Sequence, residues 1–481
     1  MTISLSDIEY KKSKVVTDTT ANGGRLGDVT VISGAKHSLF PRVTKTERVN
    51  GVTRYRKEFW KNENSDDDIA YGVLQWIEVP SNAGDRFYLK KGTDTDTQLT
   101  LETPVAGDVV QWLGGGQLET ALSGSETSVA ITMESDDFVF ENGGYLHIAD
   151  KVQASQTIAA DVNVGDSVTF GTSWTKITST SDITYPNGIC LGATTVLSVK
   201  DTTSEEWLAI AENLYADESI GTGDGTTTTP TVATLTHVTN GICQVAGKLP
   251  VISSLTTADA ALTVYLNQDG TVDTVASDAS AGELNMATGV WTTQITWDTV
   301  PGSTKDITCT YQEKPYLYAG NVVTVALDDQ VANAYTTVMT RCSACLYDAE
   351  VVSAISDEAV TAAGDGNYDY TTYPIVANNA GAEQDTITLT FTSASAFTIT
   401  GANLGVITTG TTGVNVTALN PDTSEPLFTL DHTGWSGTLA SGDTLIFSMV
   451  PSTVPVWLKE IVPALTAQEP HNLCVLGFYL E

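Results

Sequence analysis

The sequence predicts a mainly β protein with several β-sandwich or Ig-like modules in tandem and one or two short helices. Charged residues make up 17% of the chain, and Thr, Ser, Gly, Asp and Ala fill the remainder, which favours strands and tight turns over long helices. Strand-like segments recur with turn signals between them, at the spacing of a sandwich. A chain of 481 residues is long enough for about three or four such domains.

The first part of the chain predicts an extended arm followed by a β-sandwich. Residues 1–24 are expected to form the arm, which ends in the flexible stretch DTTANGG. Residues 25–150 are expected to form the first sandwich, with strands at DVTVIS, RYRKEFWKN, YGVLQWIEVP and DRFYLKKG. The glycine triplet in LGGGQ, residues 113–117, lacks the GKS/T ending of a phosphate loop and predicts a turn.

The middle of the chain predicts one helix and a further β module. Residues 151–217 are expected to form a mixed β segment whose helix spans 204–216, the stretch SEEWLAIAENLYA. The evidence for this helix is a serine cap, two early acids and an apolar spacing: Ser204, Glu205, Glu206, Trp207, Leu208, Ile210 and Leu214. Residues 218–316 predict a hairpin-rich β module that follows a linker-like run of Gly and Thr.

The last two segments differ in how clearly they can be interpreted. Residues 317–383 are mixed, because the stretch after Asp328 and Asp329 fits either a capped helix or further strands. Residues 384–481 are expected to form a C-terminal β module.

Charge is distributed unevenly along the chain. The formal net charge is −35, yet 15 of the 23 Lys and Arg residues lie at or before Lys91, against 12 acids. No Lys or Arg lies between Arg341 and Lys459. So acidic a body repels phosphate, which predicts no nucleic-acid partner. No run approaches 18 apolar residues and the first residues lack an apolar core, so neither a membrane span nor a signal peptide is expected.

The cations are densest in TRYRKEFWKN, residues 53–62, where they alternate with aromatic side chains. Arginine and aromatic residues carry much of the energy of protein interfaces, so this stretch predicts a docking surface. The predicted partner-binding residues are Arg54, Tyr55, Arg56, Lys57, Phe59 and Trp60. The alternative is that these cations pair with acids of their own chain, such as Glu58 and Asp66–Asp68.

The sequence contains no recognisable catalytic or metal-binding motif, so no enzyme activity and no cofactor are predicted. The five histidines are far apart, and the CxxC formed by Cys342 and Cys345 has no second ligand pair, so the six cysteines are expected to be buried free thiols. SDDDIA and GTDTDTQ lack the complete EF-hand pattern and leave room for weak calcium binding, or for solvated acidic turns. Tryptophans at 112, 174, 291, 297 and 435 could stack on sugars, or lie in β cores.

Three stretches resemble structural proteins of tailed bacteriophage particles. Residues 23–62 resemble an N-terminal virion module, residues 219–312 a small β module of tail and baseplate proteins, and residues 434–478 a C-terminal β module with SGTL, GD and PVW elements. Together they cover about two fifths of the chain, and they match as patterns of turns and apolar strands.

The resemblance implies a non-enzymatic building block of the tail or baseplate that docks through its basic N-terminal module. The alternatives are a head-decoration or accessory capsid protein, or a carbohydrate-binding adhesin. The implied partners are other virion proteins, copies of the same chain in a ring or trimer, and, for an adhesin, a host surface glycan; no membrane partner is implied. The expected location is the phage particle, after synthesis in the bacterial cytoplasm.

Overall fold

The computed structural model describes residues 3–33, 35, 37–81, 83–102, 111–150, 177–178, 196–197, 204–243, 249–257, 260–337, 340–468 and 474–480. Strands hold 51% of the residues and helices 4%, which confirms the mainly β prediction. The helical elements are short: α1 (Lys45–Asn50), α2 (Gln98–Glu102) and the 3-10 turns η1 (Leu5–Asp7) and η3 (His432–Gly434). Among the described residues, no helix has the length and apolar character needed to cross a bilayer.

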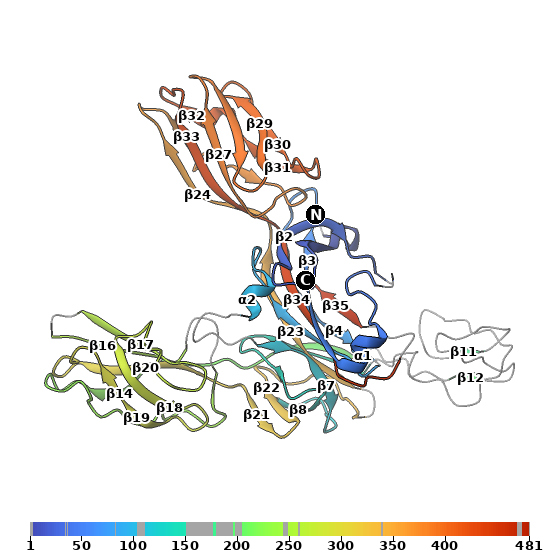
Figure 1. Ribbon diagram of the computed structural model, residues 1–481, viewed down its shortest axis with the longest axis vertical. Helices are drawn as coiled ribbons and strands as arrows, with labels where there is room; N and C mark the ends of the chain where they lie inside the picture. Colours follow the sequence, from blue (N-terminus) through green and yellow to red (C-terminus); the bar gives the residue numbers. More distant parts are fainter. Residues whose placement is uncertain are drawn as a thin grey trace.

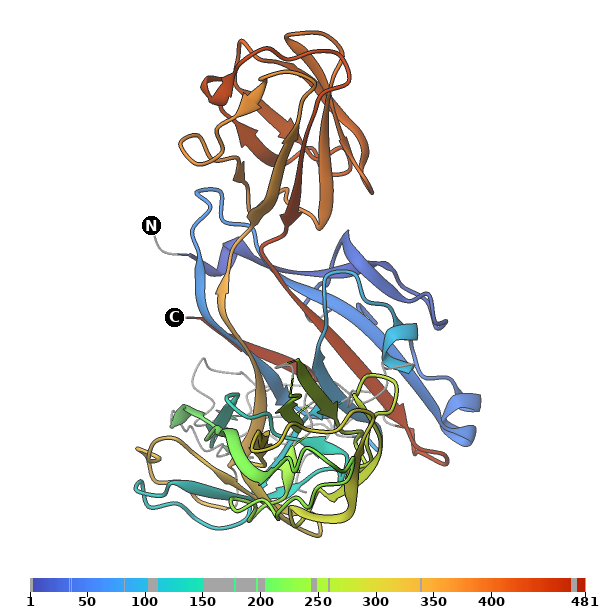
Figure 2. The ribbon, with the colours of Figure 1, turned by 90° about the vertical axis from the view of Figure 1, so that its left-hand side faces the viewer.

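The molecule consists of a central body from which two β modules project (Figure 1). The N- and C-termini both lie beside the body (Figure 2). The body is assembled from strands far apart in the sequence, and the two modules are inserted between them.

The first sheet of the body has seven strands. In spatial order they are β2 (Gly23–Thr30), β1 (Ile8–Val15), β3 (Val52–Asn62), β34 (Thr453–Val462), β5 (Arg86–Lys91), β6 (Trp112–Leu113) and β9 (Phe138–Val139). The expected extended arm at 1–24 is therefore part of the first sheet and not a segment separate from the sandwich. β1 pairs with β3 from Ile8 opposite Asn62 to Lys12 opposite Glu58, so its backbone groups are satisfied within the sheet.

The second sheet of the body has nine strands. Its main path runs β13 (Glu205–Ala209), β10 (Tyr145–Ala149), β23 (Arg341–Val351), β7 (Gly115–Leu118), β8 (Ser128–Met133), β22 (Val322–Ala326) and β21 (Tyr316–Ala319). β4 (Ala70–Val79) joins it by pairing with both β23 and β35 (Val475–Tyr479). The mixed segment 317–383 contributes β22 and β23 to this sheet, with β23 at its centre. Residues 341–351 of its ambiguous stretch are therefore strand and not helix.

The core of the body lies between its two sheets and draws on both. Trp60, Leu89 and Trp457 come from the first sheet, and Ile131 and Ile148 from the second, all within one buried apolar cluster. Burial of this apolar surface is the main stabilising term for the body.

The glycine triplet is a site of close packing and not the predicted turn. Gly115 and Gly116 lie in β7, where a Cβ atom would stand 2.3 Å from the carbonyl oxygen of Cys342 and 2.0 Å from that of Thr132. Neighbouring backbones approach so closely that a side chain has no room, which is a common reason for glycine inside a strand.

The predicted helix at 204–216 is also wrong, because this segment forms β13 and the start of β14 (Asn213–Thr222). Leu208 packs against the body core, while its neighbour Trp207 packs on the opposite face of the sheet. This alternation has the period of a strand. Pairing with β10 supplies the backbone partners that local helix propensity cannot anticipate.

The middle module has its own core and spans β14 to β20 (Asp306–Glu313). One sheet contains β14, β20, β16 (Val251–Leu255) and β17 (Ala261–Tyr265), with β15 (Ile242–Cys243) paired to β20. A hairpin of β18 (Ala279–Asn285) and β19 (Val290–Trp297) completes it. β11 (Ile177–Thr178) and β12 (Val196–Leu197) pair separately, within the segment predicted as mixed β.

The C-terminal module spans Ala354 to Val450 and differs from the predicted range of 384–481. Its largest sheet contains β24 (Ala354–Thr361), β33 (Thr444–Val450), β27 (Asp385–Phe391), β28 (Ala396–Gly401) and β29 (Gly405–Thr411). Smaller sheets contain β26 (Val376–Ala377), β31 (Pro426–Leu430) and β30 (Val416–Leu419), and β25 (Asn367–Tyr368) with β32 (Trp435–Ser436). The strands after Val450 return to the body, because their pairing partners β3 and β4 lie there.

A buried polar network fixes the C-terminal module to the body. The chain crosses twice through two-residue connections, from β23 to β24 and from β33 to β34. Fully buried Asn379 accepts from the backbone N–H of Ser353 at 2.9 Å, and its own backbone N–H donates to Asp67 Oδ1 at 2.7 Å. Ser452 Oγ donates to the carbonyl of Asn62 at 2.6 Å. Buried hydrogen bonds of this kind hold one geometry, so the module projects in a fixed direction.

Candidate functional site

The basic aromatic stretch predicted to dock a partner forms β3, an interior strand of the body. β1 lies on one side of β3, and β34 pairs with it on the other from Val52 to Lys61. Its side chains are covered as well: Arg54 and Arg56 are each 4% exposed, Lys57 is 1% exposed, and Phe59 and Trp60 are fully buried. The structure therefore does not place this stretch on a free surface, which corrects the docking expectation.

Each cation of β3 is neutralised by a carboxylate of the same chain. Arg54 contacts Glu460 at 3.0 Å and also bonds Glu47. Arg56 donates to Asp18 Oδ1 at 2.7 Å. The alternative, internal pairing, is thus correct, but the partners are not Glu58 or Asp66–Asp68. Glu460, Asp18 and Asp96 come from distant segments. Lys61 pairs with nearby Glu63 at 3.1 Å.

Lys57 is the most deeply held of these cations. Its Nζ lies 2.6 Å from Asp96 Oδ1 and donates to the carbonyl of Gly24 at 2.7 Å. Asp96 Oδ2 accepts from Trp457 Nε1 at 2.7 Å. Burial lowers the pKa of Lys57, and the charge of Asp96 opposes that shift.

The aromatic members of the stretch pack inside the body. Tyr55 lies 5.9 Å from Trp112, and Trp60 meets Phe478 edge-on at 6.2 Å. Phe59 lies beneath the ammonium of Lys57 at 4.9 Å, a cation–π contact between residues on the same side of the strand. Phe59 and Trp60 are fully buried and not available to a partner, while Tyr55 is half-buried against the body core.

Glu58 is a buried acid on the same strand. It is 1% exposed, and its Oε1 atom has no hydrogen-bond partner. Burial raises the pKa of Glu58 to about 8, so the neutral acid prevails at pH 7. Glu58 is therefore not the partner of any neighbouring cation.

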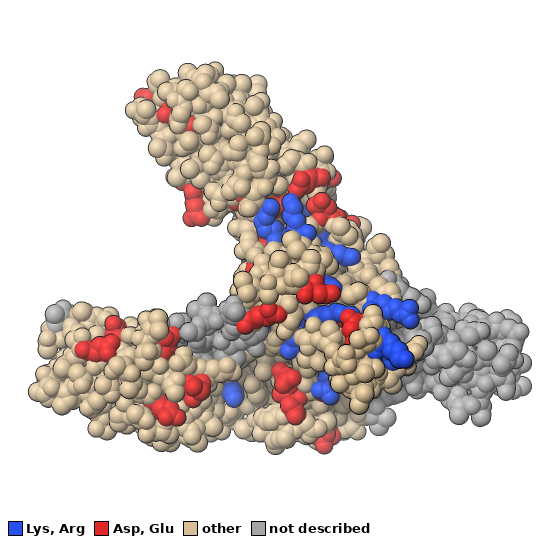
Figure 3. All heavy atoms as spheres, in the orientation of Figure 1, with Lys and Arg blue, Asp and Glu red and all other residues tan. Residues whose placement is uncertain are grey.

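Exposed cations of the N-terminal part include a group around α1, besides Lys14 and Lys91, which pair with Asp422 and Asp348. Arg42, Lys45 and Arg86 are exposed and Arg48 is half-buried. Figure 3 shows the Lys and Arg side chains gathered on the body, while this face of the C-terminal module has none. The basic character of the N-terminal part is expressed on the surface here and not at β3.

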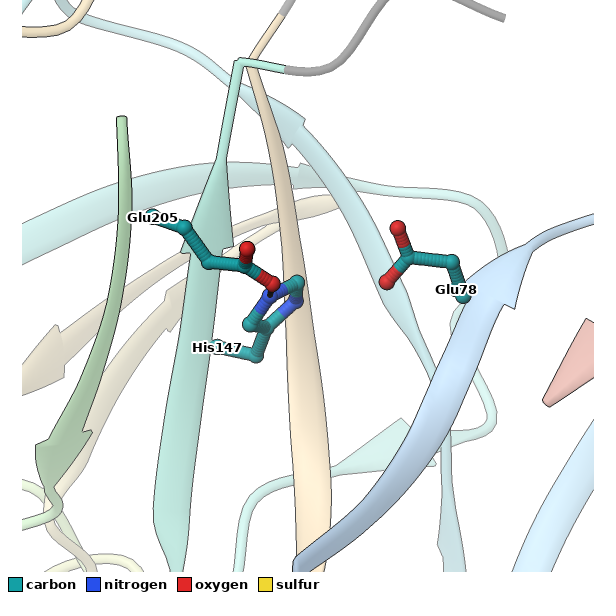
Figure 4. Close-up of side chains that lie close together, drawn as sticks. All are labelled: Glu78, His147 and Glu205. Carbon is teal, nitrogen blue, oxygen red and sulfur yellow. Dashed lines mark hydrogen bonds and ion pairs between the residues drawn. The ribbon is translucent and has the colours of Figure 1, made fainter. Parts of the chain in front are cut away.

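A second cluster unites three chemistry-bearing side chains that the sequence keeps far apart. Glu78 comes from β4, His147 from β10 and Glu205 from β13, and their ligand atoms all lie within 4.8 Å of one another. His147 Nε2 is 2.8 Å from Glu205 Oε1. Figure 4 shows the carboxylates of Glu78 and Glu205 directed toward the imidazole from opposite sides.

Strand geometry explains why these side chains meet. His147 stands directly opposite Trp207 in the β10–β13 pair, and Glu205 lies two residues from Trp207, so all three share one face. Trp76 and Glu78 share a face of β4 for the same reason. The ring of Trp76 lies 4.3 Å from His147, and that of Trp207 lies 5.4 Å from it.

Sequence reasoning missed this cluster because its members are separated by 58 or more positions and form no spaced motif. The one local signal is that a tryptophan and a glutamate lie two residues apart in each of two strands, as Trp76 with Glu78 and as Glu205 with Trp207. The pairing of β10 with β13 and the position of β4 beside them bring these side chains together, and neither can be predicted from the local pattern.

The described cysteines are free thiols, and most of them are buried. Cys243, Cys309, Cys342 and Cys345 are buried free thiols, and burial raises the pKa of Cys342 to about 12. Cys474 is a half-buried free thiol, and Cys190 lies outside the described residues.

In the acidic turns considered for calcium, Asp67 and Asp94 accept hydrogen bonds from the protein itself, and Asp96 forms an ion pair. Asp67 accepts from Asn378 and Asn379, Asp94 accepts from Thr453, and Asp96 pairs with Lys57.

The tryptophans considered for sugar stacking are mostly core residues. Trp112, Trp291 and Trp297 are at most 8% exposed. Half-buried Trp435 packs against Tyr368, Phe391 and Phe397. Trp174 lies outside the described residues. These side chains thus give a sugar-binding function no support.

Comparisons with protein-family models, with curated proteins and with solved structures find no match to this chain.

Proposed function

We propose that this protein is a non-enzymatic structural component of a tailed-phage particle, in its tail or baseplate. Two lines of reasoning support the proposal. Three stretches of the sequence resemble modules of such proteins, and the fold carries separate β modules on a common body. The location in the particle, with synthesis in the bacterial cytoplasm, belongs to the same proposal.

The observation that carries most weight is how the C-terminal module is attached. It leaves the body through two adjacent strands, and buried Asn379 and Ser452 bind the two parts together. The ion pair between Arg25 and Glu383, at 3.3 Å, adds to the junction. A projecting module held at a fixed angle suits a part that must meet its neighbours in a repeating assembly.

The assembly surface that we now favour lies around α1. Arg42, Lys45 and Arg86 are exposed there, whereas the cations of β3 are internally paired. An acidic surface on another virion protein, or on a further copy in a ring or trimer, would complement these charges.

The deciding experiment is immunogold labelling of intact and disrupted phage particles with serum against this protein. Label on the tail or its tip is the expected result. Label over the head would replace the proposal with the head-decoration alternative. Absence of label from all particles, with the antigen verified on the purified protein, would refute a virion role.

A further inference from the structure

We propose that Glu78, His147 and Glu205 bind one divalent first-row transition-metal ion, with Zn²⁺ as the probe. This inference is independent of the proposed place in a phage particle. It starts from the three ligand atoms that lie within 4.8 Å of one another on one face of the second sheet.

The distances suit a shared ion. Zinc stands about 2.0–2.2 Å from nitrogen and oxygen ligands, so two ligands of one ion are at most about 4.4 Å apart. The three ligand atoms, all within 4.8 Å of one another, exceed this limit by at most about 0.4 Å. His147 Nε2 and Glu205 Oε1, now 2.8 Å apart, would open slightly to admit the ion.

The donor set selects the class of metal. One imidazole nitrogen with two carboxylate oxygens suits zinc and its neighbours in the first transition row. Calcium takes six to eight oxygen ligands and does not favour an imidazole. Three protein ligands leave a fourth position of a tetrahedral ion for water.

Neighbouring side chains hold the ligands in place before any ion arrives. Trp76 Nε1 donates to Glu78 Oε2 at 2.6 Å, which orients that carboxylate. His147 is 2% exposed and packs against the rings of Trp76 and Trp207, which also contact each other at 5.8 Å. Such outer contacts orient ligands at known metal sites and lower the cost of binding.

The expected role of the ion is structural. β13 is the edge strand of its sheet, and β4 reaches the site from beyond β23. An ion shared by Glu78 and Glu205 would tie these two strands together across β10. A ligand that binds the folded state raises stability by about 2.7 kcal/mol at a hundred times its dissociation constant.

The test uses the full chain, stripped with a chelator and then titrated with Zn²⁺ by calorimetry and thermal unfolding. We expect one ion per chain and a rise in melting temperature. Glu78→Gln and Glu205→Gln keep the side-chain volume and should each weaken binding at least tenfold. His432→Gln, on the distant C-terminal module, is the matched control and should leave binding unchanged.

A spectroscopic measurement separates this site from adventitious binding to the acidic surface. Co²⁺ bound beside Trp76 should quench part of the tryptophan fluorescence and show a ligand-field band, and both signals should vanish in Glu78→Gln. A Glu78→Gln protein with native circular dichroism that binds Zn²⁺ as tightly as the wild type overturns the proposal. So does a wild-type chain that binds no ion.

Discussion

The burial of Lys57 makes a sharp prediction for the variant Lys57→Met, which keeps the alkyl chain and removes the charge. The substitution leaves Asp96 Oδ1 and the carbonyl of Gly24 without the ammonium that they contact at 2.6 and 2.7 Å. Breaking a buried ion pair by removing one partner costs about 3–5 kcal/mol. We expect a loss of that size in the free energy of unfolding of the body.

The assay is urea denaturation followed by tryptophan fluorescence, with Lys45→Met as the control because Lys45 is exposed on α1. The control should change stability by less than about 0.5 kcal/mol. The double variant with Asp96→Asn should recover part of the loss, since the uncompensated carboxylate is gone. A loss below about 1 kcal/mol for Lys57→Met would refute the view that β3 is an internal, charge-paired strand.

Four further outcomes follow from the same structure. Simultaneous replacement of Arg54, Arg56 and Lys57 by Glu should prevent folding, seen as insoluble protein or lost circular dichroism; a soluble, native-like variant that merely fails to join particles would restore the docking function of β3. Burial raises the pKa of Glu58 to about 8 in the folded state, against 4.5 in the unfolded chain. The contribution of Glu58 to stability is therefore complete below pH 4.5 and declines as pH rises to 8, by as much as about 5 kcal/mol. Glu58→Gln should remove this part of the pH dependence of urea unfolding, and an unchanged dependence would contradict the prediction. Asn379→Ala should lower the free energy of unfolding by about 1–3 kcal/mol and broaden the distribution of module orientations measured by small-angle scattering. Asn367→Ala, at an exposed position, is the control. A scattering curve identical to that of the wild type would show that Asn379 does not fix the junction. Gly116→Ala should lower stability by about 1–3 kcal/mol or more, because its Cβ would meet the carbonyl of Thr132, whereas Gly413→Ala, with open space around it, should be near neutral by the same unfolding assay.

The fold class was predictable because it depends on local signals. Alternation along stretches such as Thr386–Phe391 and the turns between them are read within a few residues, and the structure has strands there. The middle module was recognisable for the same reason, since its strands follow one another in sequence and pack on a core of their own. Local reading failed where a distant strand decides the outcome, as at 204–216, where β10 turns a helix-like sequence into a strand.

The candidate sites show the same division more strongly. Charge counting compared each cation of β3 with acids nearby in sequence, yet Arg54 pairs with Glu460, 406 positions away. The last strands of the chain look like any other alternating segment, so nothing local indicates that β34 inserts beside β3 and delivers that carboxylate. The histidines likewise gave no motif, because the residues beside His147 come from two other strands.

The wrong partners for the β3 cations and the missed cluster at His147 have one physical origin. The same origin explains why the body contains buried ion pairs. Each inserted module returns the chain to the body, so the body is closed by pairings of very long sequence separation, such as β3 with β34. Such pairings could slip by two residues without exposing an apolar side chain, because alternation alone fixes only which face is buried. Arg54 with Glu460 and Lys57 with Asp96 distinguish the native register from a slipped one, since a slip would leave buried charges unpaired at a cost of several kcal/mol. On this reasoning the basic strand specifies how the first sheet is assembled.

Replacing Arg54 and Glu460 together by apolar residues should then preserve stability while increasing misfolded or aggregated protein during refolding, measured as the soluble yield after dilution from urea. An unchanged yield would show that apolar packing alone sets the register.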